Sequence, residues 1–126
     1  MNRFFSLLKQ PYIYRFFIWM LNHAPFAIPV KRLRETDSLL AFFHPKPSYP
    51  FHVILMPKKA IRAFSDLEPA SPFLADLVAA VQSLVAENNL KSYRLVVNGG
   101  EAQEFPHLHF HLISSKMIVE RGMSAQ

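Results

Sequence analysis

The stretch Phe105-Pro-His-Leu-His-Phe-His-Leu-Ile113 places three histidines at alternate positions, with large apolar residues between them. Successive side chains of a β-strand point to opposite faces of the sheet. His107, His109 and His111 are therefore expected to share one accessible face of a strand. The apolar residues of the same stretch would point to the other face and enter the core: Leu108, Phe110 and Leu112.

The composition is that of one globular domain. The chain has 126 residues, of which 51% are hydrophobic and 18% charged, enough to bury a substantial core. It contains no cysteine, which excludes disulfides, thiolate zinc sites and a cysteine nucleophile. This composition is compatible with the cytoplasm, which is the location we expect.

Positive charge is concentrated at the amino-terminal end of the chain. The net charge is +5, and no acidic residue occurs in residues 1–34. Six basic residues lie in that segment: Arg3, Lys9, Arg15, Lys31, Arg32 and Arg34. Such a distribution favours an anionic partner, for example phosphate, nucleic acid or an acidic membrane surface.

Residues 1–27 are predicted to form an aromatic, basic and helical extension ahead of a domain at residues 28–126. Residues 3–9 and 11–21 indicate two short helices, separated near Pro11. The apolar run is far shorter than the roughly 20 residues that a transmembrane helix needs. Two hypotheses remain. The extension packs on its own core or on a dimer partner, or residues 3–21 contact a membrane surface.

The first half of the domain is predicted to contain three strands. Residues 30–34 and 38–43 form a hairpin around a turn at residues 35–37. Residues 51–56 form a third strand, and its continuous apolar run predicts burial on both faces. Lys58 and Lys59 follow this strand and are expected to be solvated.

The second half begins with a helix. Ser71 is the predicted N-cap, Pro72 the first helical residue, and Asn88-Asn89 the end. Its apolar stripe is expected to contain Leu74, Leu77, Val78, Val81, Leu84 and Val85. A strand at residues 93–97 and a turn at residues 98–100 precede the histidine strand. The result is an α+β fold with a five-stranded antiparallel sheet and one long covering helix.

The histidine stretch resembles the signature of the histidine triad (HIT) proteins, His-φ-His-φ-His-φ-φ, where φ is apolar. Residues 107–113 match every position of that signature. Residues 51–59 are similar to the family's His-strand-Pro-Lys segment, residues 93–99 to its Val-Asn-x-Gly turn, and Gln103 also fits. The resemblance covers about residues 28–114 and implies a HIT-like fold and a homodimer.

The resemblance also implies an activity. A HIT-like enzyme would cleave nucleoside phosphoramidates or dinucleoside polyphosphates through a nucleotidyl-histidine intermediate, with no metal or other cofactor. His109 would be the nucleophile and His107 would orient it. His111 would contact the phosphate, and His52 would support the triad by a hydrogen bond. Neutral imidazole is a competent nucleophile near pH 7.

Four further residues are candidates for substrate binding. Asn98 and Gln103 would reach the phosphate or the leaving group, as the resemblance implies. Glu104 stands where the hydrolases of the family usually carry a hydroxyl, and it would either oppose the anionic substrate or pair with His107 or His111. His44 stands where the family usually has an acidic or amide residue that binds the ribose hydroxyls.

Two alternatives to an enzyme stay open. The chain could be a noncatalytic nucleotide-binding or scaffold protein that has kept the fold. It could also bind a metal, because imidazole suits several transition metals. Histidines two apart on a strand are separated by about 6.6 Å, so three from one straight strand reach one ion poorly. A metal site would need His52 or Glu104 as a further ligand.

Overall fold

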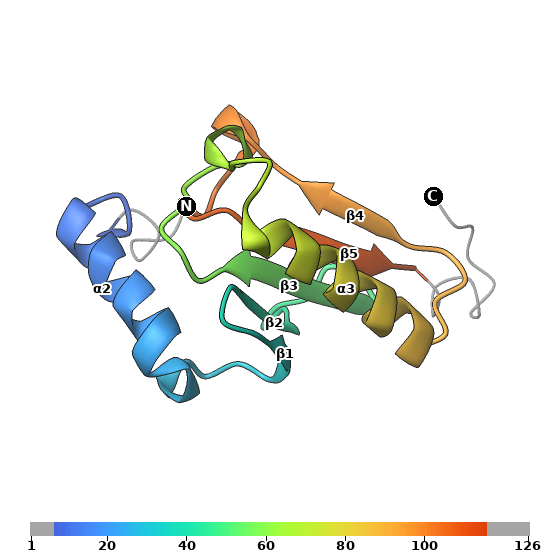
Figure 1. Ribbon diagram of the computed structural model, residues 1–126. Coiled ribbons are helices and arrows are strands. Elements are labelled where there is room, and N and C mark those ends of the chain that lie inside the picture. The colour runs from blue at the N-terminus through green and yellow to red at the C-terminus, as the bar shows by residue number, and fades with distance from the viewer. Residues whose placement is uncertain (1–6, 116–126) are drawn as a thin grey trace.

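Within residues 7–115, which the computed structural model describes, five antiparallel strands form one sheet in the order β1-β2-β3-β5-β4 (Figure 1). The strands are β1 Arg32–Glu35, β2 Leu39–Phe43, β3 Phe51–Pro57, β4 Arg94–Val97 and β5 Phe110–Ser114. The helices are α2 Pro11–His23 and α3 Pro72–Glu87, with short 3-10 turns at η1 Pro25–Ala27, η2 Phe64–Asp66 and η3 Gly100–Ala102. The predicted α+β class with a five-stranded antiparallel sheet is confirmed.

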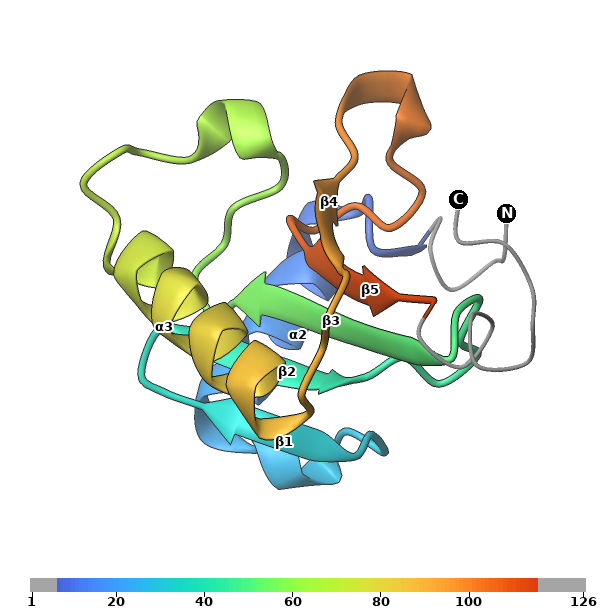
Figure 2. The same cartoon turned by 90° about the vertical axis from the view of Figure 1, so that its right-hand side faces the viewer.

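The sheet has a helix on each face (Figure 2). On one face α3 closes the larger core, and on the other α2 closes a smaller one. Alternate residues of β2 and β3 enter the two cores, so β3 is buried on both faces as its apolar run predicts. The larger core includes Leu39, Ala41, Val53, Leu55, Phe73 and Leu84; the smaller includes Leu21, Leu40, Phe42, Ile54 and Met56.

Helix α3 begins as predicted. The Ser71 hydroxyl accepts a hydrogen bond from the Phe73 main-chain N–H at 3.3 Å, which caps the helix before Pro72. The buried stripe is Phe73, Leu77, Ala80 and Leu84. The prediction for Val78 is wrong, because its side chain is 54% exposed. The buried face of α3 is therefore centred on these four residues, which pack in the core with residues of the strands.

The histidine stretch is only partly a strand, which corrects the expected row of accessible imidazoles. Strand β5 begins at Phe110, so His107 and His109 precede it, and His107 is fully buried. The main chain before the strand bonds elsewhere, because the Leu108 N–H donates to the Ile61 carbonyl at 2.9 Å. Three neighbours are buried in the larger core as predicted: Leu108, Phe110 and Leu112.

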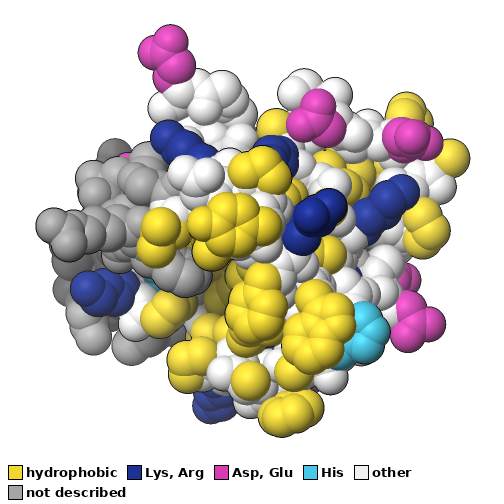
Figure 3. Space-filling model, turned by 90° about the vertical axis from the view of Figure 1, so that its left-hand side faces the viewer, with side chains coloured by type: hydrophobic (Ala, Val, Ile, Leu, Met, Phe, Trp, Pro, Cys, Tyr) yellow, Lys and Arg dark blue, Asp and Glu magenta, His cyan; other side chains and the backbone are white. Residues whose placement is uncertain are grey.

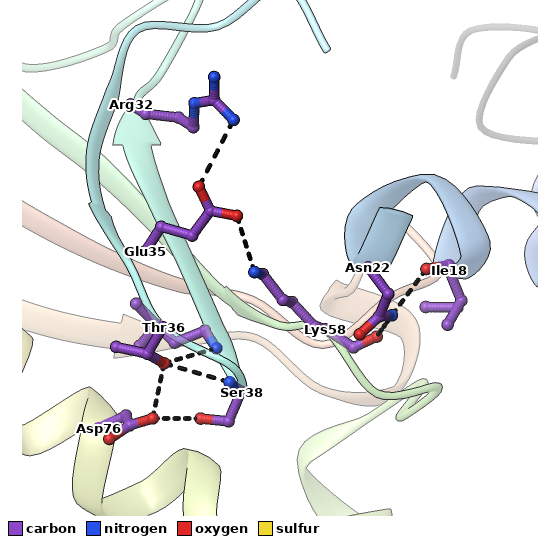
Figure 4. Close-up of polar contacts among 9 residues, drawn as sticks. Ile18, Asn22, Arg32, Glu35, Thr36, Ser38, Lys58 and Asp76 are labelled. Carbon is purple, nitrogen blue, oxygen red and sulfur yellow. Dashed lines mark hydrogen bonds and ion pairs between the residues drawn. The ribbon is translucent and has the colours of Figure 1, made fainter. Parts of the chain in front are cut away.

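The predicted second helix of the extension is confirmed as α2. Leu21 is completely buried against the sheet, so the helix packs on the chain's own core. Asn22 fixes its end by donating to the Lys58 carbonyl at 2.9 Å and the Ile18 carbonyl at 2.8 Å (Figure 4). Of the first predicted helix, residues 3–6 lie outside the described residues. No helix within residues 7–115 is long and apolar enough to cross a bilayer.

Polar contacts hold the first hairpin in place (Figure 4). Lys58 Nζ binds Glu35 Oε2 at 2.7 Å, and Lys58 is 7% exposed, so the solvated position expected for it is wrong. The hydroxyls of Thr36 and Ser38 donate to Asp76 Oδ2 on α3, each at 2.6 Å. These two bonds lower the pKa of Asp76 and join the turn between β1 and β2 to α3.

The outer surface of α2 carries exposed hydrophobic side chains (Figure 3), and several of them are aromatic. Tyr12, Phe16 and Trp19 are 66%, 59% and 51% exposed. The Phe16 and Trp19 rings stack at 6.2 Å, and Trp19 stacks on His23 at 5.1 Å. The helix is therefore apolar on both sides. A membrane-surface contact through residues 3–21 stays a hypothesis.

Candidate active site

His107 lies in the interior between α2 and the end of β3. Its Nε2 is 2.8 Å from the Pro57 carbonyl, which only accepts, so Nε2 carries the proton. Its Nδ1 is 2.6 Å from the Tyr14 hydroxyl, which donates to it. Burial lowers the pKa of His107 to about 4. Both ring nitrogens of this neutral imidazole are occupied, so the ring itself does not reach a substrate.

Tyr14 is a residue that the sequence analysis missed. It belongs to α2 and is separated from His107 by 93 positions. Burial raises the pKa of Tyr14 to about 12, so the hydroxyl keeps the proton that it donates. The Arg62 guanidinium lies 3.9 Å from the centre of the Tyr14 ring. An aromatic residue in an aromatic-rich helix carries no sequence signal for this role.

His109 is held by the main chain of the preceding histidine. Its Nδ1 is 2.7 Å from the His107 carbonyl, so Nδ1 carries the proton and donates. Burial lowers the pKa of His109, and the bond to the carbonyl opposes this shift. A neutral ring with its proton on Nδ1 has a free lone pair on Nε2. His107 thus orients His109 through its carbonyl oxygen.

His52 and His111 form a chain of oriented hydrogen bonds. The Ser48 N–H donates to His52 Nδ1 at 3.1 Å, so the His52 proton is on Nε2. His52 Nε2 donates to His111 Nδ1 at 2.9 Å, which leaves the His111 proton on Nε2. Burial, together with a smaller effect of neighbouring histidines, lowers the pKa of each ring to about 4. His111 therefore presents an N–H group beside His109, at 5.0 Å between ring centres.

His44 adjoins this chain of rings. Its ring centre is 4.5 Å from that of His52 and 6.4 Å from that of His111. The Lys46 N–H donates to His44 Nδ1 at 2.9 Å, so the proton of the neutral ring is on Nε2. Burial lowers the pKa of His44, and the neighbouring His109 lowers it further.

A cavity of about 510 Å³ lies between α2 and the sheet, and both His44 and His109 line it. Its volume is in the range of sites that enclose a small organic ligand. Helix α2 forms one wall and strands β2 and β3 another. His109 thus borders a ligand-sized space.

The HIT domain model matches residues 26–118. The chain belongs to the histidine triad (HIT) family. It is similar to HIT-like proteins of Helicobacter pylori (30% identical, 69% of this chain and 86% of that one) and Azospirillum brasilense (33%, 72% and 80%). Both relatives are uncharacterized.

Solved HIT structures share the fold. A HIT family hydrolase from Legionella pneumophila is 31% identical with a TM-score of 0.67, covering 75% of this chain and 89% of that one. A histidine triad protein from Clostridium difficile is 25% identical with a TM-score of 0.68, covering 79% and 88%. The predicted HIT-like fold is confirmed, and its hydrolase members are among the structures that this chain resembles.

Within residues 7–115, the remaining HIT-derived candidates form no hydrogen bond with the triad histidines. Asn98 is exposed after β4. Gln103 uses its amide N–H groups to bind the main-chain carbonyls of Arg62 at 2.6 Å and Phe105 at 3.0 Å. Glu104 is exposed, and within residues 7–115 it has no hydrogen bond or ion pair. Pairing of Glu104 with His107 is wrong in this structure, because both ring nitrogens of His107 are occupied.

The described part of the chain contains no set of side chains that supports the metal hypothesis. Between residues 7 and 115, no group of three or more His, Cys, Asp or Glu side chains is arranged to hold an ion. His52 and His111 bind each other, and His107 is enclosed by Tyr14 and Pro57. The geometry thus separates the three histidines into three different environments.

Proposed function

We propose that this HIT protein is a nucleotidyl hydrolase or transferase that cleaves nucleoside phosphoramidates or dinucleoside polyphosphates through His109. One observation carries the proposal. The 2.7 Å bond from His109 Nδ1 to the His107 carbonyl leaves the Nε2 lone pair free, and His109 lines a ligand-sized cavity. An activated nucleophile needs a fixed orientation and an unprotonated attacking atom.

The surrounding charges favour the same chemistry. The pKa values of His44, His52, His107, His109 and His111 are all lowered, mainly by burial, so these rings are neutral at pH 7. His109 is then a nucleophile without prior loss of a proton. The N–H on His111 Nε2 is available to a phosphoryl oxygen, where it stabilises developing charge.

The reaction has two steps. For a phosphoramidate, His109 Nε2 attacks phosphorus, a new P–N bond forms, and the bond from phosphorus to the leaving amine breaks. The leaving amine takes its proton from water. Water then attacks the nucleotidyl-histidine and loses a proton to the solvent, the bond to His109 breaks, and a nucleoside monophosphate is released. In transfer, another hydroxyl or phosphate group replaces water.

Mass spectrometry of the protein quenched during turnover tests this proposal. With adenosine 5′-phosphoramidate and diadenosine polyphosphates, we expect a nucleotidyl adduct on His109. His109→Ala should lose the adduct and several orders of magnitude in kcat. His23→Ala is the matched control, because this exposed histidine belongs to α2 and contacts Trp19 rather than the triad.

Three outcomes contradict the proposal: no turnover of any conjugate, an adduct on another residue, or parental activity in His109→Ala. Chelator treatment should leave the activity unchanged. Activity that disappears with chelator and returns with zinc would support the metal hypothesis instead.

A further inference from the structure

The cavity beside His109 is lined almost entirely by apolar side chains. Its only polar lining side chains within the described residues are the imidazoles of His44 and His109. Among residues 7–115, no hydroxyl, amide or carboxylate side chain lines it. The apolar walls come from α2, from the segment after it and from the sheet, and they include Phe17, Met20, Ile28, Phe42, Ile54 and Met56.

His44 supplies little hydrogen bonding to a sugar. Its Nδ1 already accepts from the Lys46 N–H at 2.9 Å, so its ring offers one N–H donor and no acceptor. A cis-diol is recognised when both hydroxyls donate to fixed acceptors. Hydroxyl groups that lose water on entering an apolar site without acceptors are bound weakly.

The position of the cavity defines what would occupy it. His109 lines the cavity, so a phosphorus atom within reach of Nε2 carries its other substituent into the same space. The amino-terminal extension builds one wall, since α2 contributes Phe17 and Met20. The occupant is therefore a group attached to phosphorus, and the walls favour an apolar one.

We propose that this site recognises the substituent on phosphorus by apolar contact alone and does not select the sugar hydroxyls of a nucleotide. Its substrates are phosphorus conjugates with a flat or chain-like apolar group, which includes nucleobases as well as aryl and alkyl groups. The proposal rests on the proposed function for the reaction at His109, and it extends that function from nucleotides to a wider class of phosphate conjugates.

Calorimetric binding of monophosphates to His109→Ala protein tests this recognition without turnover. The series is AMP, 2′-deoxy-AMP, 2′,3′-dideoxy-AMP, 1-naphthyl phosphate and methyl phosphate. We expect the three adenine compounds to bind within threefold of one another. 1-Naphthyl phosphate should bind at least tenfold more tightly than methyl phosphate, because only its ring fills the cavity.

Two results overturn the inference. AMP that binds more than tenfold more tightly than 2′,3′-dideoxy-AMP would show that the diol is read. 1-Naphthyl phosphate that binds no better than methyl phosphate would show that the cavity does not take the substituent. Turnover of the corresponding phosphoramidates by the parent protein reports separately on the reaction, so the recognition proposal and the proposed function fail in different measurements.

A filled cavity gives a second test. Met20→Trp adds volume to the wall and should weaken 1-naphthyl phosphate at least tenfold relative to the parent, with methyl phosphate unchanged. Tyr12→Trp is the matched control, since Tyr12 lies on the same helix, is 66% exposed and does not line the cavity. Equal loss for both phosphates would place the effect outside the cavity and contradict the proposal.

Discussion

Tyr14 links the amino-terminal helix to the triad through one buried hydrogen bond. Its hydroxyl donates to His107 Nδ1, while His107 Nε2–H donates to the Pro57 carbonyl. Hydrogen bonds at both ring nitrogens therefore fix the position of His107, whose main-chain carbonyl accepts the hydrogen bond from His109. Because a buried acceptor without a donor is costly, the contact contributes to stability and holds the His107 carbonyl in place.

Tyr14→Phe should therefore lower the free energy of unfolding by about 1–3 kcal/mol, since His107 Nδ1 loses its donor in the interior. We expect kcat to fall severalfold with little change in KM, because the cavity walls are not altered. Urea denaturation and steady-state kinetics measure the two effects. Tyr12→Phe is the control at a site that is 66% exposed. Parental stability in Tyr14→Phe would contradict this role.

His107 makes the protein sensitive to acid. Its pKa is about 4 when folded, below the value of about 6.5 in an unfolded chain. Between those values the unfolded chain binds a proton that the folded protein does not. The stability is therefore complete above about pH 6.5 and is lost as the pH falls toward 4.

For His107 alone, we expect the free energy of unfolding to fall by about 2 kcal/mol between pH 7.5 and pH 5. His52 and His111 act in the same direction, since their folded pKa values are also about 4. Urea titrations at several pH values measure the slope. His107→Gln, which does not titrate, should show a shallower slope. Equal stability of the parent at pH 5 and pH 7.5 would exclude this linkage.

At the scale of elements, α2 is part of the core and not an appendage. Leu21 is completely buried with Leu40, Phe42, Ile54 and Met56 on the sheet face opposite α3. The same helix supplies Tyr14 to the triad and one wall of the cavity. The extension thus closes the second core and shapes the site.

Leu21→Ala should lower the free energy of unfolding by about 2–5 kcal/mol, because it leaves a cavity in a packed core. Tyr12→Ala, on the exposed face of the same helix, should change it by less than about 0.5 kcal/mol. Chemical denaturation of the two variants measures the difference. Similar stability in both would mean that α2 does not pack on the sheet in solution.

At the scale of the whole molecule, one edge of the sheet is suited to self-association. Strand β4 lies at one edge of the sheet. Leu95, within this strand, is 42% exposed, and Tyr93, just before it, is 49% exposed. Val78 of α3 is 54% exposed. Unpaired edge strands with apolar side chains invite pairing, and two-fold pairing of identical edges closes the assembly.

We therefore propose a two-fold homodimer formed through β4 and α3. Sedimentation at micromolar concentration should give a dimer, and Leu95→Lys should shift it toward monomer. Tyr12→Lys, on the exposed face of α2 and on the side of the sheet opposite α3, is the control at a distant surface. A parent protein that sediments as a monomer over this range would exclude the dimer.

Helices and strands could be predicted from local patterns in the sequence. Ser71 and Pro72 predicted the start of α3, and the alternation of Leu108, Phe110 and Leu112 predicted their burial. The histidine signature predicted the fold. These signals are carried by neighbours in the chain, where backbone preference and hydrophobic period act directly.

The environment of each polar group depends on tertiary contacts between segments that are far apart in the sequence. Lys58 is buried by its pairing with Glu35, and His107 is buried against Tyr14, 93 positions away. Such partners fix which imidazole nitrogen carries the proton, and no spacing in the sequence encodes them. By itself the sequence therefore determined the order of strands and helices along the chain and the histidines at the site, but not where the histidine strand begins. The tertiary structure decided burial, proton positions and the apolar cavity, because these depend on contacts between residues far apart in the chain.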